Sequence, residues 1–215
     1  TSRIVRGVPA HLDDPDEFDP TPWELYEYDE NDNAGRTHPT EAGDYDHHWN
    51  APTSRGFDAQ GREVETVERN RRAGEAGTPP EEYRTTRTFD ARDEVTEVVD
   101  ALGRVATRHV YDLAGNRIRT ESLDAGVERT VRDAAGNPVE RRDPRGAVTL
   151  AAFDRGNRRT HEWGRDESGS FSLVERVVYG DADAGPSDAR ARSANCLGRT
   201  YRRYDGAGAV IVEYD

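Results

Sequence analysis

Tyr111-Asp112-Leu113-Ala114-Gly115-Asn116-Arg117 is the stretch that decides the fold, because its Asp-x-x-Gly core returns repeatedly along the chain. An Asp side chain at the start of a turn accepts a hydrogen bond from the backbone two residues on, and Gly adopts the positive φ that closes the turn. Each copy therefore predicts a tight turn between two strands. The predicted turn pairs are Asp58/Gly61, Asp100/Gly103, Asp112/Gly115, Asp133/Gly136, Asp143/Gly146 and Asp205/Gly208.

Looser copies fill the gaps in this series. Asp93 stands where Gly is expected after Asp90, and a Gly comes one residue early after Asp124 and Asp154. With these copies, an Asp recurs at positions 90, 100, 112, 124, 133, 143 and 154. Such regular self-similarity is the signature of a repeat architecture.

The residues between the turns predict β-strands over 104–111, 116–122, 127–132, 147–153 and 172–179. Successive side chains of a strand point to opposite faces, so Val127, Arg129 and Val131 lie on one face of their strand. Short strands with turns about every 9–12 residues are typical of consecutive antiparallel hairpins. We therefore predict an all-β array of short antiparallel hairpins.

The composition disfavours a thick core. Of the 215 residues, 33% are hydrophobic and 34% are charged, and the mean hydropathy is -1.00. Because most strands offer few apolar residues on their better face, we predict a single-layer sheet that is wet on both sides, not a sandwich. Arg–carboxylate pairs and aromatic rungs would stabilise it; the predicted rungs are Phe89, Tyr111, Phe153 and Tyr204. Disorder is the alternative reading of this composition.

Two parts are predicted along the chain. Residues 1–55 are acidic, rich in Pro and aromatic residues, and predicted to be an irregular connecting segment. Residues 56–215 form the repeat array, with inserted loops at 71–82 and 181–195. The chain starts without Met, and we expect it to be a piece of a longer protein.

The repeated Tyr-Asp-x-x-Gly-Asn/Arg motif resembles the RHS/YD repeats of bacterial polymorphic toxins and teneurins, over about residues 57–215. The stretch Thr21-Pro22-Trp23-Glu24-Leu25-Tyr26-Glu27-Tyr28-Asp29, and the later His48-Trp49-Asn50-Ala51-Pro52, resemble a narrower group. That group is the B component of insecticidal toxin complexes (the Salmonella virulence plasmid/TcdB-type family), at the point where its chain enters the RHS shell.

The resemblance implies a curved, spiralling sheet that forms part of a hollow shell. In that family the B component closes with a C component around a toxic C-terminal polypeptide, which an A-type translocation component injects. The implied role is therefore a non-catalytic shell segment of a secreted or cell-surface protein. The chain contains neither the family's β-propeller nor its autoprotease region. The alternative function is a cell-surface RHS/YD array for adhesion or contact-dependent competition, binding glycan or protein.

Charge and hydropathy exclude other classes. The net charge of -13 disfavours nucleic acid as a partner, because phosphates require a basic face. No apolar run approaches the length of about 18 residues that a membrane helix needs, so we expect no membrane insertion by this segment. All basic residues are Arg, which favours bidentate pairing with carboxylates.

Two clusters contain metal-ligating residue types, and neither is predicted to be a metal site. Asp29, Asn31 and Asn33 have the spacing of a calcium loop, but Ala34 and Thr40 stand where that loop needs Gly and Glu. We expect a hydrogen-bonded turn there. The cluster of His38, His47 and His48 with Asp44 and Asp46 lacks the convergence that zinc requires.

No catalytic residue and no cofactor are predicted, so the chain is expected not to be an enzyme. No His is predicted to lie beside the single Cys196, because His161 belongs to a separate strand, so we do not expect this thiol to be a nucleophile. Asp143-Pro144-Arg145-Gly146 resembles the autoproteolytic Asp-Pro-x-Gly of the family, but it lies in register with the other turns. The pair Glu81/Glu82 is too ordinary in so acidic a chain to mark a general acid and base.

Overall fold

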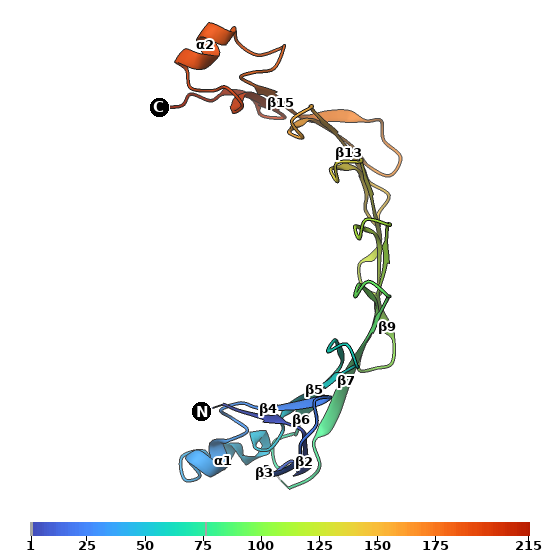
Figure 1. The fold of residues 1–215 in the computed structure, drawn as a ribbon, viewed down its shortest axis with the longest axis vertical. Helices are drawn as coiled ribbons and strands as arrows, with labels where there is room; N and C mark the ends of the chain where they lie inside the picture. The colour runs from blue at the N-terminus through green and yellow to red at the C-terminus, as the bar shows by residue number, and fades with distance from the viewer. Residues whose placement is uncertain (1, 76) are drawn as a thin grey trace. The chain divides into compact units, whose positions relative to one another are not determined.

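The computed structural model describes residues 2–75 and 77–215 and shows an all-β chain of two compact units, Thr1–Arg108 and His109–Asp215 (Figure 1). The predicted fold class, an array of antiparallel hairpins, is confirmed. The predicted boundary near residue 55 lies inside the first unit.

In the first unit the hydrogen-bonded order is β1-β4-β5-β6-β7-β8-β9, with every neighbouring pair antiparallel, while β2 and β3 form a separate hairpin. The bounds are β1 Arg3–Arg6, β2 Val8–His11, β3 Asp14–Asp19, β4 Glu24–Tyr28, β5 Thr53–Phe57, β6 Glu63–Asn70, β7 Glu81–Phe89, β8 Val95–Val99 and β9 Val105–Tyr111. A short helix α1 (Ala34–Thr37) and a 3-10 helix η1 (Gly43–His48) connect β4 to β5.

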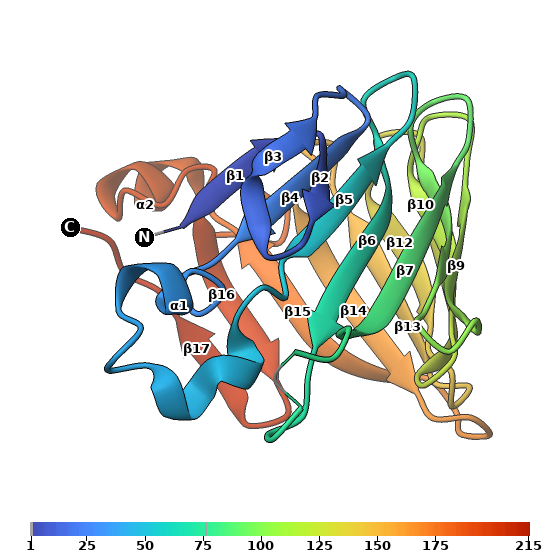
Figure 2. The same cartoon turned by 90° about the horizontal axis from the view of Figure 1, so that it is seen from below.

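The second unit, which begins within β9, is a meander in which each strand pairs with the next (Figure 2). Its strands are β10 Arg117–Ser122, β11 Gly126–Arg132, β12 Pro138–Arg142, β13 Val148–Phe153, β14 Arg159–Arg165, β15 Ser172–Tyr179, β16 Thr200–Asp205 and β17 Gly208–Ile211. Helix α2 (Asp188–Ser193) lies in the connection between β15 and β16. The strands predicted at 104–111, 116–122, 127–132, 147–153 and 172–179 agree with β9, β10, β11, β13 and β15 to within one residue.

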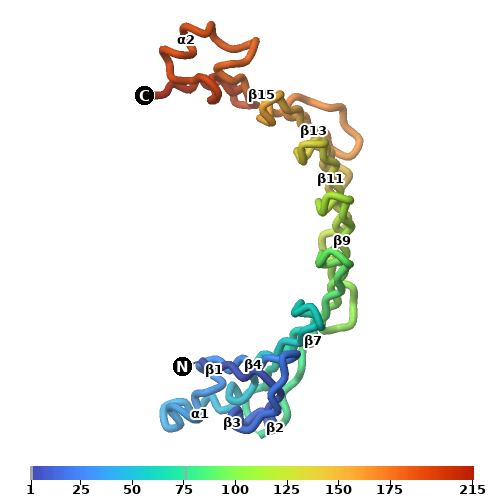
Figure 3. The backbone as a smooth tube through the Cα atoms, viewed as in Figure 1, coloured from blue at the N-terminus to red at the C-terminus, as the bar shows by residue number. Residues whose placement is uncertain are grey.

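The first 55 residues differ from the irregular segment that we predicted, because they contain β1 to β4. Their strands form for a tertiary reason, since Val5, Tyr26 and Tyr28 make the buried core of this unit and Leu12 packs against it from the β2–β3 hairpin. Figure 3 shows this hairpin beside β4 at the N-terminal end of the first unit. The apolar residues that supply this core are spread over separate strands, which hides the pattern in the sequence.

The second unit has almost no core in its central strands. In β10–β14, which are described in full, Val148 is the one buried strand residue. Near the C-terminal end, Val178, Ala191 and Cys196 are also buried. The central strands therefore depend on ladder hydrogen bonds and cross-strand side-chain pairs, as a single-layer sheet requires.

Candidate functional site: linked turns along the sheet edges

The repeated Asp builds each turn through its side chain as well as its backbone. Asp58 Oδ1 accepts hydrogen bonds from the backbone N–H groups of Gln60 (2.9 Å) and Arg62 (3.1 Å). The Gly61 N–H donates to the Asp58 carbonyl at 2.9 Å, and Gly61 has a φ of 78°. One carboxylate oxygen thus accepts from two backbone donors that would otherwise have only water.

The same geometry recurs at other predicted turns and at two of the loose copies. Oxygen Oδ1 accepts from the N–H groups two and four residues on, at 2.8–3.1 Å, in Asp90, Asp100, Asp112, Asp133, Asp143 and Asp154. In the two loose copies a non-Gly residue takes the left-handed conformation, Asp93 at φ 67° and Asn157 at φ 58°. Asn and Asp tolerate this region because their short polar side chains bond locally.

Gly103 closes the predicted turn at Asp100 through its backbone alone. Its N–H donates to the Asp100 carbonyl at 2.9 Å, and its φ is 74°. The residue is exposed, and no atom lies within 4 Å of the point where a Cβ would stand. Glycine therefore serves here for its positive φ and not for close packing. The strand predicted to begin directly after Gly103, at Arg104, begins one residue later, at Val105, because the Arg104 backbone N–H still donates to Asp100 within the turn.

The other turn glycines of the series have the same conformation. The N–H groups of Gly115, Gly136 and Gly146 donate to the carbonyls of their turn Asp residues at 3.0–3.2 Å. Their φ values are 80°, 86° and 87°. A Cβ on Gly146 would lie 2.9 Å from Glu167 Cγ, so this turn, unlike that of Gly103, also has a close neighbour.

Two predicted turns are built differently. In the hairpin between β10 and β11 the Ser122 hydroxyl, and not Asp124, accepts from a backbone N–H, that of Ala125, at 3.2 Å. Reading Asp124 as a loose copy was therefore wrong. Asp205 pairs directly with Gly208 in the β16–β17 ladder and accepts from the Ala207 N–H at 2.9 Å, so its hairpin is tighter than the others.

These hydrogen bonds hold the carboxylates of Asp58, Asp100 and Asp133 in their charged form. The Arg62 guanidinium holds the pKa of Asp58 below its usual range, and Arg104 does the same for Asp100. The side-chain amide of Asn137 lowers the pKa of Asp133. These groups are therefore anionic acceptors at neutral pH, and none has the raised pKa that a general acid needs.

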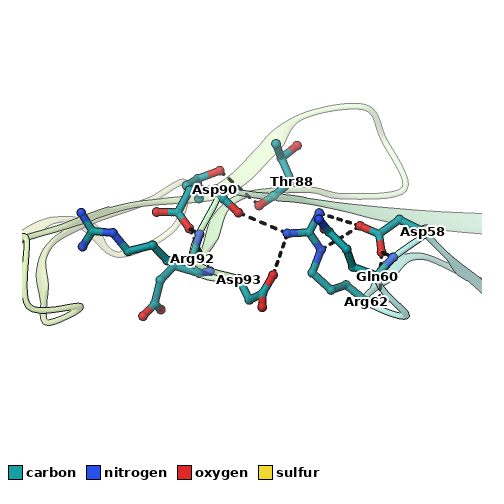
Figure 4. Close-up of polar contacts among 9 residues, drawn as sticks. Asp58, Gln60, Arg62, Thr88, Asp90, Arg92 and Asp93 are labelled. Carbon is teal, nitrogen blue, oxygen red and sulfur yellow. Dashed lines mark hydrogen bonds and ion pairs between the residues drawn. The ribbon is translucent and has the colours of Figure 1, made fainter.

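Arg62, four positions after the turn residue Asp58, links its own turn to the neighbouring turn along the same edge, as Figure 4 shows. Its Nε donates to Asp58 Oδ2 at 2.7 Å. Its Nη1 donates to the Asp90 carbonyl at 3.1 Å and to Asp93 Oδ1 at 2.9 Å. The guanidinium carbon also lies 4.9 Å from the ring centre of Phe89. One side chain thus fixes its own turn, the next turn and the aromatic residue that precedes it.

The second unit contains the same device at Arg158. Its Nε donates to Asp154 Oδ2 and its Nη1 to Asp181 Oδ1, both at 2.8 Å. Its guanidinium carbon lies 4.2 Å above the ring of Tyr179. Sequence reasoning assigned no role to this position.

A related contact occurs one turn earlier along the same edge. The Asn137 amide donates to Asp133 and to Asn157, at 2.9 and 3.1 Å. Asn137 and Arg158 both occupy the last place of the repeated motif, four residues after the turn Asp. The Asn/Arg at that place is the sequence signal that could have found the linking residues.

Three of the four residues predicted as aromatic rungs contact arginine or histidine side chains. Phe89 lies under Arg62, and the Tyr204 hydroxyl accepts from Arg202 at 3.0 Å. The Tyr111 ring lies 6.3 Å from that of His109. Phe153 pairs with Arg159 across β13 and β14. Their role in stabilising the array stays a prediction.

The candidate calcium loop is a network of local hydrogen bonds. Asp29 Oδ1 accepts from the N–H groups of Asn31 and Asp32, at 2.8 and 2.9 Å. The Asn33 amide donates to the Asp29 carbonyl at 2.8 Å. Asp32, which sequence reasoning did not single out, is buried and accepts from the Ala51 N–H at 2.8 Å. Burial raises the pKa of Asp32.

The histidine cluster is brought together only in part. The His47 and His48 rings lie 4.0 Å apart, whereas His38 bonds the hydroxyl of Thr37. Within 2–75 and 77–215, no three His, Cys, Asp or Glu side chains are grouped as a metal would need.

The remaining residues that were considered for catalysis take part in packing or in local hydrogen bonds. Cys196 is a free, fully buried thiol packed against Gly180. The predicted turn at Asp143 has the same hydrogen bonds as its neighbours, and Pro144 packs against Gly126 of the adjacent turn. Glu81 accepts from the Tyr83 hydroxyl at 2.8 Å.

A polar hollow of about 670 Å³ lies on the first unit, and some of the charged groups that line it are paired with one another. Arg55 pairs with Glu27 at 3.1 Å, and Arg87 pairs with Glu63 at 2.8 Å and with the Thr66 hydroxyl at 2.9 Å. Such alternating cross-strand pairs stabilise a sheet. These ion pairs are therefore part of the lattice that stabilises the sheet.

Comparison with solved structures finds the same fold in toxin complexes. The chain matches the crystal structures of TcdB2-TccC3-TEV (TM-score 0.75, 23% identity) and TcdB2-TccC3 (TM-score 0.74, 23% identity) over 90% of its length. It also matches the Photorhabdus luminescens Tc holotoxin pore over 91% of its length, with a TM-score of 0.77 and 24% identity. The fold implied by the resemblance of the repeats is thereby confirmed.

The matched region is 9% of the length of each of these three solved chains, so the present chain corresponds to a small part of them. No family model and no curated protein matches the sequence. No helix in the described part of the chain is long and apolar enough to cross a membrane.

Proposed function

We propose that this chain is a non-catalytic segment of an RHS-repeat toxin-complex shell, which encapsulates a toxic C-terminal polypeptide and helps to deliver it. The observation that carries the proposal is the match of about nine tenths of the chain to Tc toxin complexes at TM-scores of 0.74–0.77.

The construction of the sheet supports the same role. A shell wall is wet on its outer and inner faces, so its strands need polar side chains on both. The central strands β10–β14 have this character, with Val148 as their buried residue. Arginine links such as those of Arg62 and Arg158 stiffen the edges without an apolar core.

The proposed function implies specific partners. They are the rest of the RHS shell with its C component, the enclosed toxin polypeptide, and an A-type translocation component reached through regions outside this segment. The protein would act outside the producing cell, secreted or at the cell surface. Neither nucleic acid nor a cofactor has a part in this role.

Protease protection tests the proposal on the whole parent protein, co-expressed with the C component. We expect the C-terminal toxic segment to be detached from the chain yet resistant to added protease, and to become sensitive once denaturant unfolds the shell. Mass spectrometry of that segment before and after denaturation is the readout. A control digestion of the same segment expressed alone should be complete at once.

Immediate digestion of the segment inside the native parent protein would overturn encapsulation. The repeats would then form an open array, as in the adhesion alternative, and binding of the parent protein to glycans or to a cell-surface protein would become the experiment to perform.

A further inference from the structure

Seven arginines of the second unit, on β10–β12 and β14–β16, lie on one face, which we name the arginine face; Arg117 lies on it two residues before Arg119. Partners directly across an antiparallel ladder share a face, as do residues two apart along a strand. Arg119 stands opposite Arg129, and Arg129 stands opposite Arg142. Val148 follows in the same row, between Arg142 and Arg165. Arg176 and Arg202 lie on the same face further along the sheet.

This face has an excess of positive charge that its own residues do not neutralise. Its carboxylates on β10–β16 are Glu121 and Glu140, which lie 2.9 Å from Arg119 and 2.5 Å from Arg142. Among the residues that the structure describes, Arg129, Arg165, Arg176 and Arg202 pair with no carboxylate. Like charges directly across a ladder are destabilising, so the row from Arg119 to Arg142 lowers the folding stability of the chain when no partner is bound.

The opposite face of the same strands shows what the sheet's arginines do when carboxylates are present. There Arg141 pairs with Glu128 at 2.8 Å. Arg159 and Arg203 both pair with the buried Glu175, at 2.6 and 2.5 Å. Each of these three arginines has a carboxylate partner within the chain, whereas Arg132 of β11, on the same opposite face, donates to the Gly136 carbonyl.

Unsatisfied donors mark the arginine face independently of the charge count. The Nε atoms of Arg119, Arg165 and Arg202 are buried, and in the described part of the chain none has a hydrogen-bond acceptor. An unpaired polar group shielded from water costs free energy. A carboxylate that binds as the side chain turns its Nε edge outward would accept from Nε and Nη together, which would remove that cost.

An apolar row runs between the arginines. Val131 stands opposite Glu140, and Leu150 stands opposite both Glu140 and Trp163. Val131 is half exposed, and the Trp163 ring stacks on His161 with the ring centres 5.2 Å apart. A partner for this face therefore needs carboxylates on either side of apolar side chains.

We propose that the arginine face binds an acidic polypeptide segment that carries apolar side chains between its Asp and Glu residues. A polypeptide fits better than a nucleic acid for two reasons. The central row is aliphatic at Val131 and Leu150, which complements apolar side chains rather than phosphates. The whole chain has a net charge of -13, which repels an extended polyanion more strongly than a short peptide. The inference does not depend on the proposed shell function.

Fluorescence anisotropy with the full 215-residue chain tests this binding. The probe is a labelled peptide of about a dozen residues in which Glu alternates with Leu and Ser. The comparison probes are the same peptide with Lys for Glu, the same peptide with Ser for Leu, and a single-stranded oligothymidine. We expect the Glu/Leu peptide to bind most tightly, with an affinity that falls as salt screens the ion pairs.

Two variants with the same change in net charge separate the arginine face from the chain's overall charge. The first carries Arg129→Gln, Arg165→Gln and Arg176→Gln. The control carries Arg145→Gln, Arg155→Gln and Arg190→Gln, which are exposed arginines of turns and of α2. We expect the first variant to weaken peptide binding by roughly tenfold and the control to change it by less than about twofold. Circular dichroism checks that both are folded.

If the first triple variant fails to fold, Arg129→Gln alone, at an exposed position, gives the same comparison against Arg155→Gln. Equal weakening in the arginine-face and control variants would overturn the proposal, as would tighter binding of the Lys peptide. Oligothymidine binding that exceeds peptide binding and is lost in the arginine-face variant would assign the surface to nucleic acid instead. Equal affinity for the Leu and Ser peptides would overturn the role of the apolar row.

Discussion

Arg158 and Asp181, which are 23 positions apart in the sequence, are joined by an ion pair of 2.8 Å that connects the β13–β14 turn to the β15–β16 connection. The same arginine holds its own turn through Asp154 and covers the ring of Tyr179. Arg62 makes the matching set of contacts in the first unit. A short turn motif thus supplies long-range contacts as well as a local bend.

Replacing Arg158 should loosen this connection. We expect Arg158→Gln to lower the free energy of unfolding by about 1–2 kcal/mol, because it removes two ion pairs and a cation–π contact at a largely covered side chain. Chemical denaturation monitored by circular dichroism measures the change. Arg155→Gln, at an exposed position of the same turn, is the matched control and should leave stability unaltered. Equal effects of the two changes would contradict the linking role.

The turn glycines should resist any side chain for a conformational reason. Gly103 and Gly136 have φ values of 74° and 86° and open space where a Cβ would stand, so the only cost of Gly103→Ala or Gly136→Ala is the left-handed backbone. That cost is about 1–2 kcal/mol at each position. Gly43→Ala, which also meets open space but has no positive φ, should cost nothing by the same denaturation measurement. Neutral changes at Gly103 and Gly136 would show that these turns can change type.

Acid should destabilise the array through its turn carboxylates. The pKa values of Asp58, Asp90, Asp100, Asp112, Asp133 and Asp154 are lowered from 3.8 in the folded chain. A lowered folded-state pKa gives stability that is fully present above the unfolded value and lost as pH falls through the folded one.

We therefore expect unfolding midpoints that change little from these groups between pH 7 and about 5 and fall steeply below about pH 4. Asp32 acts in the opposite direction, because its pKa is raised by burial and its protonation favours the folded state. The stabilisation that Asp32 gains on protonation does not offset the stability that the six turn aspartates lose. Thermal unfolding across this pH range is the measurement, and stability that rises on acidification below pH 4 would refute the expectation.

Glu175 should be the most costly carboxylate to remove from the second unit. Its side chain is only 10% exposed and accepts from both Arg159 and Arg203, at 2.6 and 2.5 Å. Glu175→Ala removes the acceptor that the two arginines share and leaves Arg159 with Glu162 and Arg203 with Asp205 at 3.8 Å, and we expect a loss of about 2 kcal/mol in unfolding free energy. Glu128→Ala removes a single, more exposed pair with Arg141 and should cost less than about 1 kcal/mol. The reverse order would contradict the burial argument.

The β15–β16 connection closes over Cys196 by a tight backbone contact. A Cβ on Gly180 would lie 2.2 Å from the Cys196 carbonyl oxygen and 2.7 Å from its sulfur. Gly180→Ala should therefore displace the connection and cost about 1–3 kcal/mol. The same substitution should make the Cys196 thiol react faster with a disulfide reagent that releases a coloured product. Gly206→Ala, which meets no atom within 4 Å, is the control, and an unreactive thiol in both variants would show that the connection tolerates the added methyl group.

Much of the fold follows from local chemistry that is legible in the sequence. The side-chain hydrogen bonds of Asp112 and the positive φ of Gly115 define a turn within five residues. The turn and its flanking strands could therefore be placed to within one residue. Strands β1 to β4 could not be predicted in the same way. They form because Val5, Tyr26 and Tyr28 meet in one buried cluster. No local sequence pattern indicates which residues, far apart in the chain, will pack together in that cluster.

The sequence by itself determined the hairpin array and the alternation of side chains along each strand, because both depend on backbone conformation within a few residues. It predicted that Arg129 shares a face with Val127 and Val131. Only the tertiary structure decided that Arg129 would stand between Arg119 and Arg142, and that Arg158 would reach Asp181. The physical reason is that strand register and contacts between turns are set by pairing across the ladder, and a repeating motif allows several registers of similar local energy.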